Sequence, residues 1–210
     1  MGLHSSRFCG LPYSARGFTL LELMFAIAIA AVILAVGAPS FAEFRRNARL
    51  TSVANDFLAA TQLARTEAIK RRTTVSICPS SSASSNAPAC DSADFGGWII
   101  FEDSDRSCTR EAAEAVIGGE APINDAGVSD TFRVTAAANG GCVSIASTGY
   151  VDDRAALPSL TRIVYCDARG IAGQGGSNRA DARALAVDAN GRARITREAD
   201  VISAWGIDCP

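Results

Sequence analysis

The chain of 210 residues contains very little histidine and very little lysine. His4, near the N-terminus, is the single histidine, and Lys70 is the single lysine. Ser-His-Asp and Cys-His catalysis both need a histidine held within the fold, and His4 is poorly placed for that role. The sequence also lacks the G-x-x-x-x-G-K-[ST] spacing of a phosphate-binding loop. These absences predict a protein that is not an enzyme and uses no cofactor.

A second absence concerns metal ligands. The seven cysteines include no Cys-x-x-Cys pair, and no histidine follows residue 4, so no metal site is expected. Seven cysteines are many for a cytosolic chain of this size and favour structural disulfides in an oxidising compartment. Apart from Cys9, an even number remains, whose connectivity the sequence alone does not choose. These are Cys78, Cys90, Cys108, Cys142, Cys166 and Cys209.

A long apolar run follows the N-terminal region. The 20 residues from Leu23 to Ala42 carry no charge, and as an α-helix they would cross a ~30 Å hydrocarbon core. An ordinary signal anchor explains this length but not Glu22, because an acid at the centre of a membrane costs ~2.5–3.5 kcal/mol and so indicates a partner. Pro39 removes a helical N–H, which predicts either a simple kink at the membrane surface or a looser helix.

The helical pattern continues to about residue 72 and then changes. An apolar stripe at helical spacing comprises Leu50, Val53, Ala54, Phe57, Thr61, Ala64 and Ala68. Alternating patterns predict strands over 73–78, 97–102, 131–136, 142–147, 161–166, 183–188 and 192–196. The acidic segment 103–130 is expected to be irregular. One long N-terminal helix followed by strands predicts an α+β fold, with the helix packed on an antiparallel sheet.

The stretch RGFTLLEL, residues 16–23, resembles the processing site of type IV pilins and type II secretion pseudopilins. The resemblance implies that a prepilin peptidase cuts after Gly17 and methylates the new N-terminus at Phe18. It also implies that Glu22 pairs with the Phe18 amine of a neighbouring subunit during assembly, and that the helix melts near Pro39 in a filament.

Four further stretches, VSICPS, GWIIF, CDARG and ARALAVDANGRARI, resemble the GspH/FimT group of minor pilins and minor pseudopilins. The resemblance implies a pilin-like fold with a leader at 1–17, an N-terminal helix at 18–72 and a β-rich domain at 73–210. Within the helix, a transmembrane part at about 23–42 precedes an amphipathic spine at about 44–72. The chain would lie in the bacterial inner membrane, with its β-rich domain in the periplasm, and in an assembled pilus or pseudopilus with other pilin subunits. The resemblance favours the disulfides Cys78–Cys90 and Cys166–Cys209, which leaves Cys108 for Cys142.

Asn190-Gly191 predicts a β-hairpin near the C-terminus. If the loop is Ala189–Gly191, Asp188 faces Arg192 and Ala186 faces Arg194. The apolar residues of both strands then share the opposite face, and a slip of one residue would bury the charges. Gly191 takes the left-handed position, and Arg192 and Arg194 project together into solvent.

The letters GRAR resemble the G-R-x-R motif of FimT minor pilins, which is implicated in DNA binding during natural transformation. The resemblance implies a site built from Gly191, Arg192, Arg194 and Arg197, which Arg162, Arg169, Arg179 and Arg183 would extend. Because no aromatic residue is interleaved with these arginines, double-stranded DNA is the expected partner, bound weakly through its backbone. The alternative is a solvated surface on which Asp188 neutralises Arg192.

Two functions fit these features. The first is a FimT-like minor type IV pilin that contributes to pilus assembly and DNA uptake. The second is a GspH-like minor pseudopilin of a type II secretion system, with a purely structural role in priming a filament. The helix and the disulfides serve both, and the C-terminal arginines favour the first.

Overall fold

The computed structural model describes residues 17–92, 94–122, 133–136, 141–152, 161–167, 169–171, 177–207 and 209. Of the predicted leader, residues 1–17, only Gly17 is therefore described, and Cys9 lies outside the described residues. The chain divides into two compact units, Met1–Phe44 and Arg45–Pro210. The predicted spine thus belongs to the same unit as the strands.

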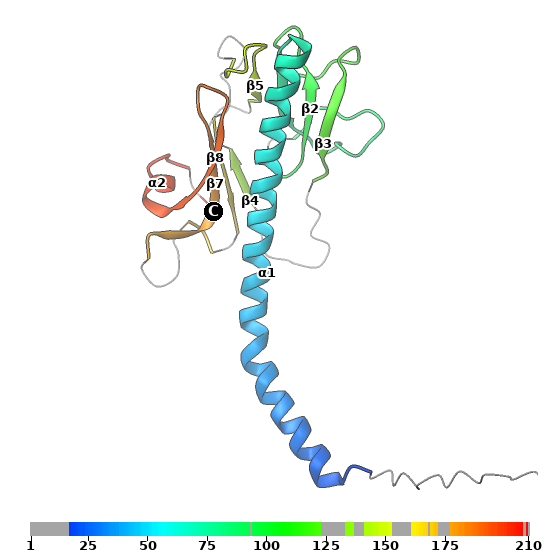
Figure 1. The fold of residues 1–210 in the computed structure, drawn as a ribbon, viewed down its shortest axis with the longest axis vertical. Coiled ribbons are helices and arrows are strands. Elements are labelled where there is room, and N and C mark those ends of the chain that lie inside the picture. The colour runs from blue at the N-terminus through cyan, green and yellow to red at the C-terminus, as the bar shows by residue number, and fades with distance from the viewer. Residues whose placement is uncertain are drawn as a thin grey trace, which may run out of the picture. The chain divides into compact units, whose positions relative to one another are not determined.

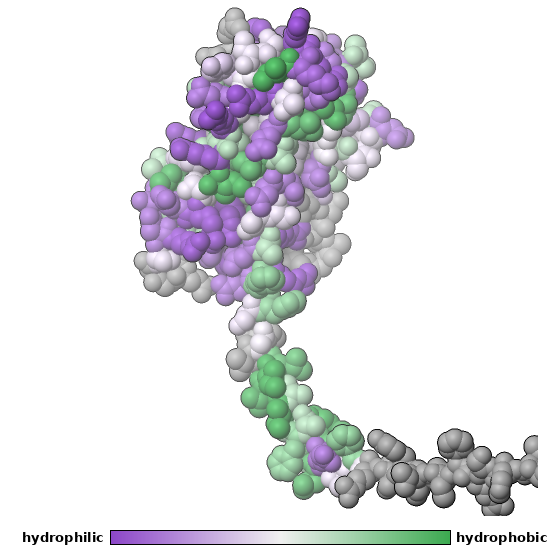
Figure 2. Space-filling model, viewed as in Figure 1, coloured by the Kyte–Doolittle hydropathy of each residue, from purple (hydrophilic) through white to green (hydrophobic). Residues whose placement is uncertain are grey.

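Helix α1 (Leu20–Arg71) begins in the first unit. The hydroxyl oxygen of Thr19 accepts a hydrogen bond from the backbone N–H of Glu22 at 3.2 Å, so Thr19 caps the helix. Thr19 and Glu22 also have the S/T-x-x-E spacing of a capping box. The described large apolar side chains between Leu20 and Phe44 are exposed, and they form the mainly hydrophobic surface that Figure 2 shows for this unit.

No single helix in the described part of the chain is both long and apolar enough to cross a membrane. One bent pair of helical segments, Leu20–Ala35 and Ser40–Arg71, meets the requirements of length and composition together. The break between the two segments contains Gly37 and Pro39. The side chain of Pro39 lies outside the described residues, so the kink or loosening there stays a prediction.

In the second unit, α1 supplies one wall of the hydrophobic core. The predicted apolar stripe is confirmed, because all of its residues are buried: Leu50, Val53, Ala54, Phe57, Thr61, Ala64 and Ala68. Thr61 is accommodated there because its hydroxyl donates to the carbonyl oxygen of Phe57 at 3.0 Å. The Phe57 ring packs edge-on against the rings of Phe95 and Trp98, with centroids 5.3 and 5.2 Å away.

The described strands form two four-stranded antiparallel sheets, and residues of both join the core on α1 (Figure 1). The first sheet has the order β3-β2-β1-β5. Its strands are β1 (Val75–Pro79), β2 (Trp98–Glu102), β3 (Val116–Glu120) and β5 (Val143–Ile145). Val75 lies opposite both Glu102 and Ile145, so β1 is an interior strand, and all five of its residues are buried.

The second sheet has the order β4-β6-β7-β8. Its strands are β4 (Arg133–Ala136), β6 (Arg162–Cys166), β7 (Arg179–Val187) and β8 (Ala193–Glu198). Tyr165 and Leu185 face the core on α1, whereas Val164 and Ala184 pack with Ile202 of the short helix α2 (Ala199–Ser203). Strands β6 and β7 are therefore covered on both faces, and β8 is an edge strand.

The predicted fold class is confirmed, since a long N-terminal helix packs on antiparallel strands. Each predicted strand is present, although the strands form two sheets rather than one. The prediction of an irregular segment over 103–130 is wrong for Val116–Glu120, which is β3. This strand contains two adjacent glycines, Gly118 and Gly119, which are unusual inside a strand, so its sequence did not indicate one. Gly119 is needed there, because a Cβ on it would lie 2.7 Å from the carbonyl oxygen of Trp98 in the neighbouring strand.

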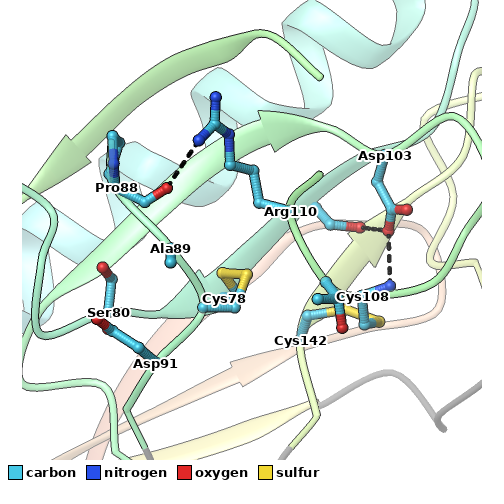
Figure 3. Close-up of a disulfide and its surroundings, with 12 residues drawn as sticks. Cys78, Ser80, Pro88, Ala89, Asp91, Asp103, Cys108, Arg110 and Cys142 are labelled. Carbon is cyan, nitrogen blue, oxygen red and sulfur yellow. Dashed lines mark hydrogen bonds between the residues drawn. A yellow bond between two sulfur atoms is a disulfide. The ribbon is translucent and has the colours of Figure 1, made fainter. Parts of the chain in front are cut away.

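Three disulfides tie loops to the sheets: Cys78–Cys90, Cys108–Cys142 and Cys166–Cys209. Figure 3 shows the region of the first two, where the loops after β1 and β2 meet. There the guanidinium of Arg110 donates to the carbonyl oxygen of Pro88 at 3.1 Å, which joins the loop after β2 to the loop after β1. The third disulfide fastens the C-terminal segment to the end of β6. The pairing is the one that the resemblance favours.

Candidate nucleic-acid interface

The hairpin between β7 and β8 has the predicted register, which is confirmed. Ala186 lies opposite Arg194, and the N–H of Asp188 donates to the carbonyl oxygen of Arg192 at 2.9 Å. The N–H of Gly191 donates back to the carbonyl oxygen of Asp188 at 2.9 Å, and Gly191 has φ +68°, in the left-handed region. The turn therefore fixes which side chains of β8 face outward.

The turn packs closely against a second glycine, Gly149. A Cβ on Gly191 would overlap the carbonyl oxygen of Gly149, and a Cβ on Gly149 would lie 2.9 Å from Cδ1 of Ile69 on α1. Gly149 has φ +82°, so this position also favours glycine. The hairpin is thus held close to α1 through two residues without side chains.

Arg192 and Arg194 are both exposed, as predicted. The carboxylate of Asp188 accepts a hydrogen bond from the backbone N–H of Arg192 at 2.9 Å, so it serves the turn. Within the described part of the chain, neither guanidinium forms an ion pair. The side-chain neutralisation of Arg192 by Asp188 that the alternative reading expected is thus not seen.

A third exposed arginine lies on the same face of the sheet. Arg162 of β6 and Arg194 of β8 both lie opposite Ala186 of β7, one on each side of it. The guanidinium carbon of Arg162 is 5.3 Å from the ring centroid of Trp205, a cation–π distance. An aromatic side chain that follows the arginine-rich stretch in the sequence therefore lies beside Arg162 in the fold.

Arg183 does not belong to the exposed surface, contrary to the prediction. Its side chain is buried, and its guanidinium donates to the hydroxyl of Thr51 at 3.1 Å and to the carbonyl oxygen of Asp181 at 2.7 Å. Burial, with smaller contributions from neighbouring arginines, lowers the pKa of Arg183 to about 10, so it stays charged at neutral pH. The register of β7 and β8 shifts between Arg179 and Ala184, and Arg183 bonds to carbonyl groups in that irregular segment.

Of the other predicted arginines, some are exposed and some are used within the fold. Arg179 is exposed, whereas Arg197 is half-buried and donates to the carbonyl oxygen of Ala180 at 3.4 Å. Burial and then the charge of Arg179 lower the pKa of Arg197. Arg169 forms ion pairs with Asp167 at 2.6 Å and Asp181 at 3.4 Å, so it is used within the fold. Of the seven arginines predicted for the site, all of which the structure describes, four are exposed: Arg162, Arg179, Arg192 and Arg194.

A separate group of carboxylates lies in the loop after β2. Oxygens of Asp103, Asp105 and Glu114 lie within 4.8 Å of one another. The loop itself supplies donors to them: the N–H of Ser107 bonds to Asp103 at 2.9 Å, and that of Ser104 bonds to Glu114 at 3.0 Å. The carboxylates thus act as structural acceptors that hold the loop together.

The residues predicted for processing are exposed at the start of α1. Gly17 and Phe18 precede the helix, and Glu22 lies in its first turn. Among the described residues, no atom other than those of its chain neighbours would lie within 4 Å of a Cβ on Gly17. Processing at this position stays a prediction.

Comparison with known families gives two matches. Residues 53–196 match the family described as Type II transport protein GspH, and residues 13–38 match the prokaryotic N-terminal methylation motif. The first match spans more than half of the chain, and the chain belongs to the GspH family of minor pilins and pseudopilins. It is accordingly a structural subunit and not an enzyme. The methylation motif implies a prepilin peptidase and other pilin subunits as partners, and an anchor in the inner membrane.

Two crystal structures of the type IV minor pilin FimU from Pseudomonas aeruginosa (strain PAO1) are similar to the chain. Their sequences are 19% and 20% identical to it, and the TM-scores are 0.43 and 0.37. The alignments cover 73% and 70% of this chain and 92% and 91% of FimU. No curated protein matches the sequence. The family assignment therefore rests on the match to the GspH family over residues 53–196.

Proposed function

We propose that the chain is a FimT-like minor type IV pilin that contributes to pilus assembly and binds double-stranded DNA during natural transformation. The exposed pair Arg192 and Arg194, on a turn of fixed register, is the observation that carries the DNA-binding part. Neither side chain is used in an ion pair within the described part of the chain. Their charges therefore remain available to an anion.

The chemistry of these side chains suits a phosphate backbone. A guanidinium is a planar fork that donates two parallel hydrogen bonds to phosphate oxygens. Arg192 directly precedes β8 and Arg194 is its second residue, so alternation puts both forks on one face, ~7 Å apart along the chain. Contacts of this kind neutralise phosphates without reading bases, so we expect a dissociation constant of ~10⁻⁴–10⁻⁶ M that rises steeply with salt.

The assembly part of the proposal concerns the N-terminal unit. A prepilin peptidase cuts after Gly17, removes residues 1–17 and methylates Phe18. Glu22 then pairs with the Phe18 amine of a neighbouring subunit, residues 23–42 lie in the inner membrane, and residues 73–210 form the periplasmic domain. The exposure of Glu22 and of the apolar side chains around it supports this role, because an exposed acid in an apolar segment requires a partner in lipid or in a filament.

The test measures duplex binding by the full chain in nanodiscs of zwitterionic lipid. A fluorescent DNA duplex is titrated at several salt concentrations with wild type and with Arg192→Gln plus Arg194→Gln. The matched control, Arg45→Gln plus Arg72→Gln, removes the same charge from exposed arginines elsewhere. We expect the hairpin variant to lose most binding and to lower the slope of log K against log salt by ~1.8, since two phosphate contacts are lost.

Two results would contradict the DNA-binding part. Equal losses in the hairpin variant and in its control would show that only overall charge matters. If wild type does not bind duplex even at low salt, the chain is better described as a structural subunit, and the second candidate function takes precedence.

That second candidate is a minor pseudopilin with a purely structural, filament-priming role. The observation in its favour is the family match itself, whose description is Type II transport protein GspH. In-vivo cysteine cross-linking from the exposed anchor distinguishes the two candidates. Cross-links to pilus subunits support the pilin, and cross-links to pseudopilins support the secretion subunit.

A further inference from the structure

A groove of about 380 Å³ lies between α1 and the β7–β8 turn. Its walls come from two elements that are far apart in sequence. They are Gln62, Arg65 and Thr66 of α1, and Gly191, Arg192 and Ala193 of the hairpin. None of these residues is acidic, whereas the amide, the hydroxyl and both guanidinium groups can all donate hydrogen bonds. The composition of the walls therefore fits an oxyanion.

Arg65 is held against the hairpin by packing. Its Cδ lies 3.7 Å from the position of a Cβ on Gly191, and its Nε lies 3.2 Å from the position of a Cβ on Gly149. The two glycines thus leave the space that the Arg65 side chain occupies. A side chain positioned in this way loses little further freedom when it binds a ligand.

Several other arginines of this unit form ion pairs with acids. The shortest ion pairs formed by others are Arg71–Glu67 at 2.6 Å, Arg169–Asp167 at 2.6 Å and Arg106–Asp152 at 3.2 Å. Arg65 forms no ion pair within the described residues, and its Nε is buried there without a hydrogen-bond acceptor. A covered guanidinium N–H without an acceptor is unfavourable. A structural role in the fold therefore does not account for this cation.

Two cations lining one groove repel each other, and an anion between them removes the repulsion. We propose that Arg65 of α1 and Arg192 of the hairpin together bind one phosphate of a nucleic-acid backbone, with Gln62 and Thr66 as additional donors. This inference rests on the proposed function, and it extends the DNA-binding surface from the hairpin to the helix. A duplex held at this groove continues past Arg194, ~7 Å further along β8.

The test uses the same full chain in nanodiscs, with Arg65→Gln as the variant and Arg45→Gln as the control. Each change removes one charge from α1, and the two positions lie ~30 Å apart along the helix. For Arg65→Gln we expect about tenfold weaker duplex binding, as for a lost charged hydrogen bond, and a salt slope smaller by ~0.9. Arg45→Gln should leave both quantities unchanged. Arg65→Lys keeps the charge without the fork, so it should bind more weakly than wild type and retain the salt slope.

The outcomes separate this inference from the proposed function. If Arg65→Gln and Arg65→Lys bind as wild type while the Arg192 and Arg194 double variant does not, the groove is not a phosphate site and the proposed function stands. Equal weakening by Arg65→Gln and Arg45→Gln likewise overturns the inference. If wild type binds no duplex, both proposals fail. Circular dichroism and thermal unfolding of each variant identify loss of fold, and the lysine variant serves as the test if the glutamine variant does not fold.

Discussion

At the residue scale, Gly191 meets two separate constraints. Its φ of +68° is unfavourable for residues with a Cβ, and that Cβ would also overlap the carbonyl oxygen of Gly149. Gly170 has a similar φ of +73°, but no atom of the described residues beyond its chain neighbours lies within 4 Å of its Cβ position. The two glycines therefore separate conformational strain from steric overlap.

We predict that Gly191→Ala lowers the free energy of unfolding by ~2–4 kcal/mol, whereas Gly170→Ala lowers it by ~1–2 kcal/mol. The difference measures the overlap with Gly149, because the backbone strain is similar in both variants. Urea denaturation of the two variants and wild type gives the values. Equal losses would mean that the turn does not press on Gly149 in solution.

Asp103 is fully buried and accepts hydrogen bonds from the hydroxyl of Ser76 at 2.5 Å and the N–H of Ser107 at 2.9 Å. Burial raises the pKa of Asp103, and the hydrogen bonds oppose this only in part. Between the ordinary pKa of ~3.9 and the raised value, the folded state binds more protons than the unfolded state. In that window, the contribution of Asp103 to stability falls as pH rises.

We therefore predict that the stability of wild type relative to Asp103→Asn declines as pH rises from about 3 to 7. The asparagine does not titrate, so taking the difference isolates Asp103 from the other acids. Denaturant unfolding at a series of pH values measures it. A relative stability that rises over this interval would contradict the raised pKa.

The exposure of individual arginines could be predicted from the sequence only in part. Arg192 and Arg194 were predictable because alternation in β8 separates them from Ala193 and Ile195. The same alternation applies to Arg183. It alternates with Ala184 and shares a face with the apolar residue Leu185. Charge alone placed Arg183 on the surface, and the acceptors that hold it, on Thr51 and Asp181, were not visible in the sequence.

At the element scale, the disulfides close chain segments of different length. Cys78–Cys90 joins residues 12 apart, and Cys166–Cys209 joins residues 43 apart. In the chain-entropy description, the longer loop restricts the unfolded chain more. Cys166–Cys209 also holds the C-terminal segment that follows α2.

We predict that Cys166→Ala plus Cys209→Ala lowers the free energy of unfolding by ~4 kcal/mol, and Cys78→Ala plus Cys90→Ala by ~3 kcal/mol. Thermal or denaturant unfolding of each double variant against wild type provides the measurement. A larger loss for the shorter loop would show that packing around Cys78, rather than chain entropy, dominates.

The strands and the helix differ in how directly the sequence predicted them. The buried stripe of α1 follows from helical periodicity, and β1 and β2 follow from their β-branched and aromatic residues. Strand β3 was missed because Gly118 and Gly119 resemble a loop, although they allow close approach to β2. The groove that contains Arg65 was also missed. It depends on contact between α1 and a turn more than a hundred residues later, which no local pattern reports.

At the scale of the whole molecule, one helix serves two sheets. The cluster around Phe57 takes residues from β1, β2 and β5 of the first sheet and from β6 and β7 of the second. Composition and periodicity predicted that the helix packs on strands, but not how the strands divide between two sheets. That division depends on pairing between distant segments, such as β1 with β5 and β4 with β6, which alternation alone does not specify.

The hydrogen bond that caps α1 has a further consequence for maturation. Both of its partners, Thr19 and Glu22, lie downstream of Gly17. Removal of everything before Phe18 would leave the cap intact, so the same helix can begin at Leu20 in the precursor and in the shortened chain. The cut would also create a positively charged amine beside the positive end of the helix dipole, an unfavourable arrangement. Glu22, in the first turn, would offset that charge within its own chain until another subunit arrives.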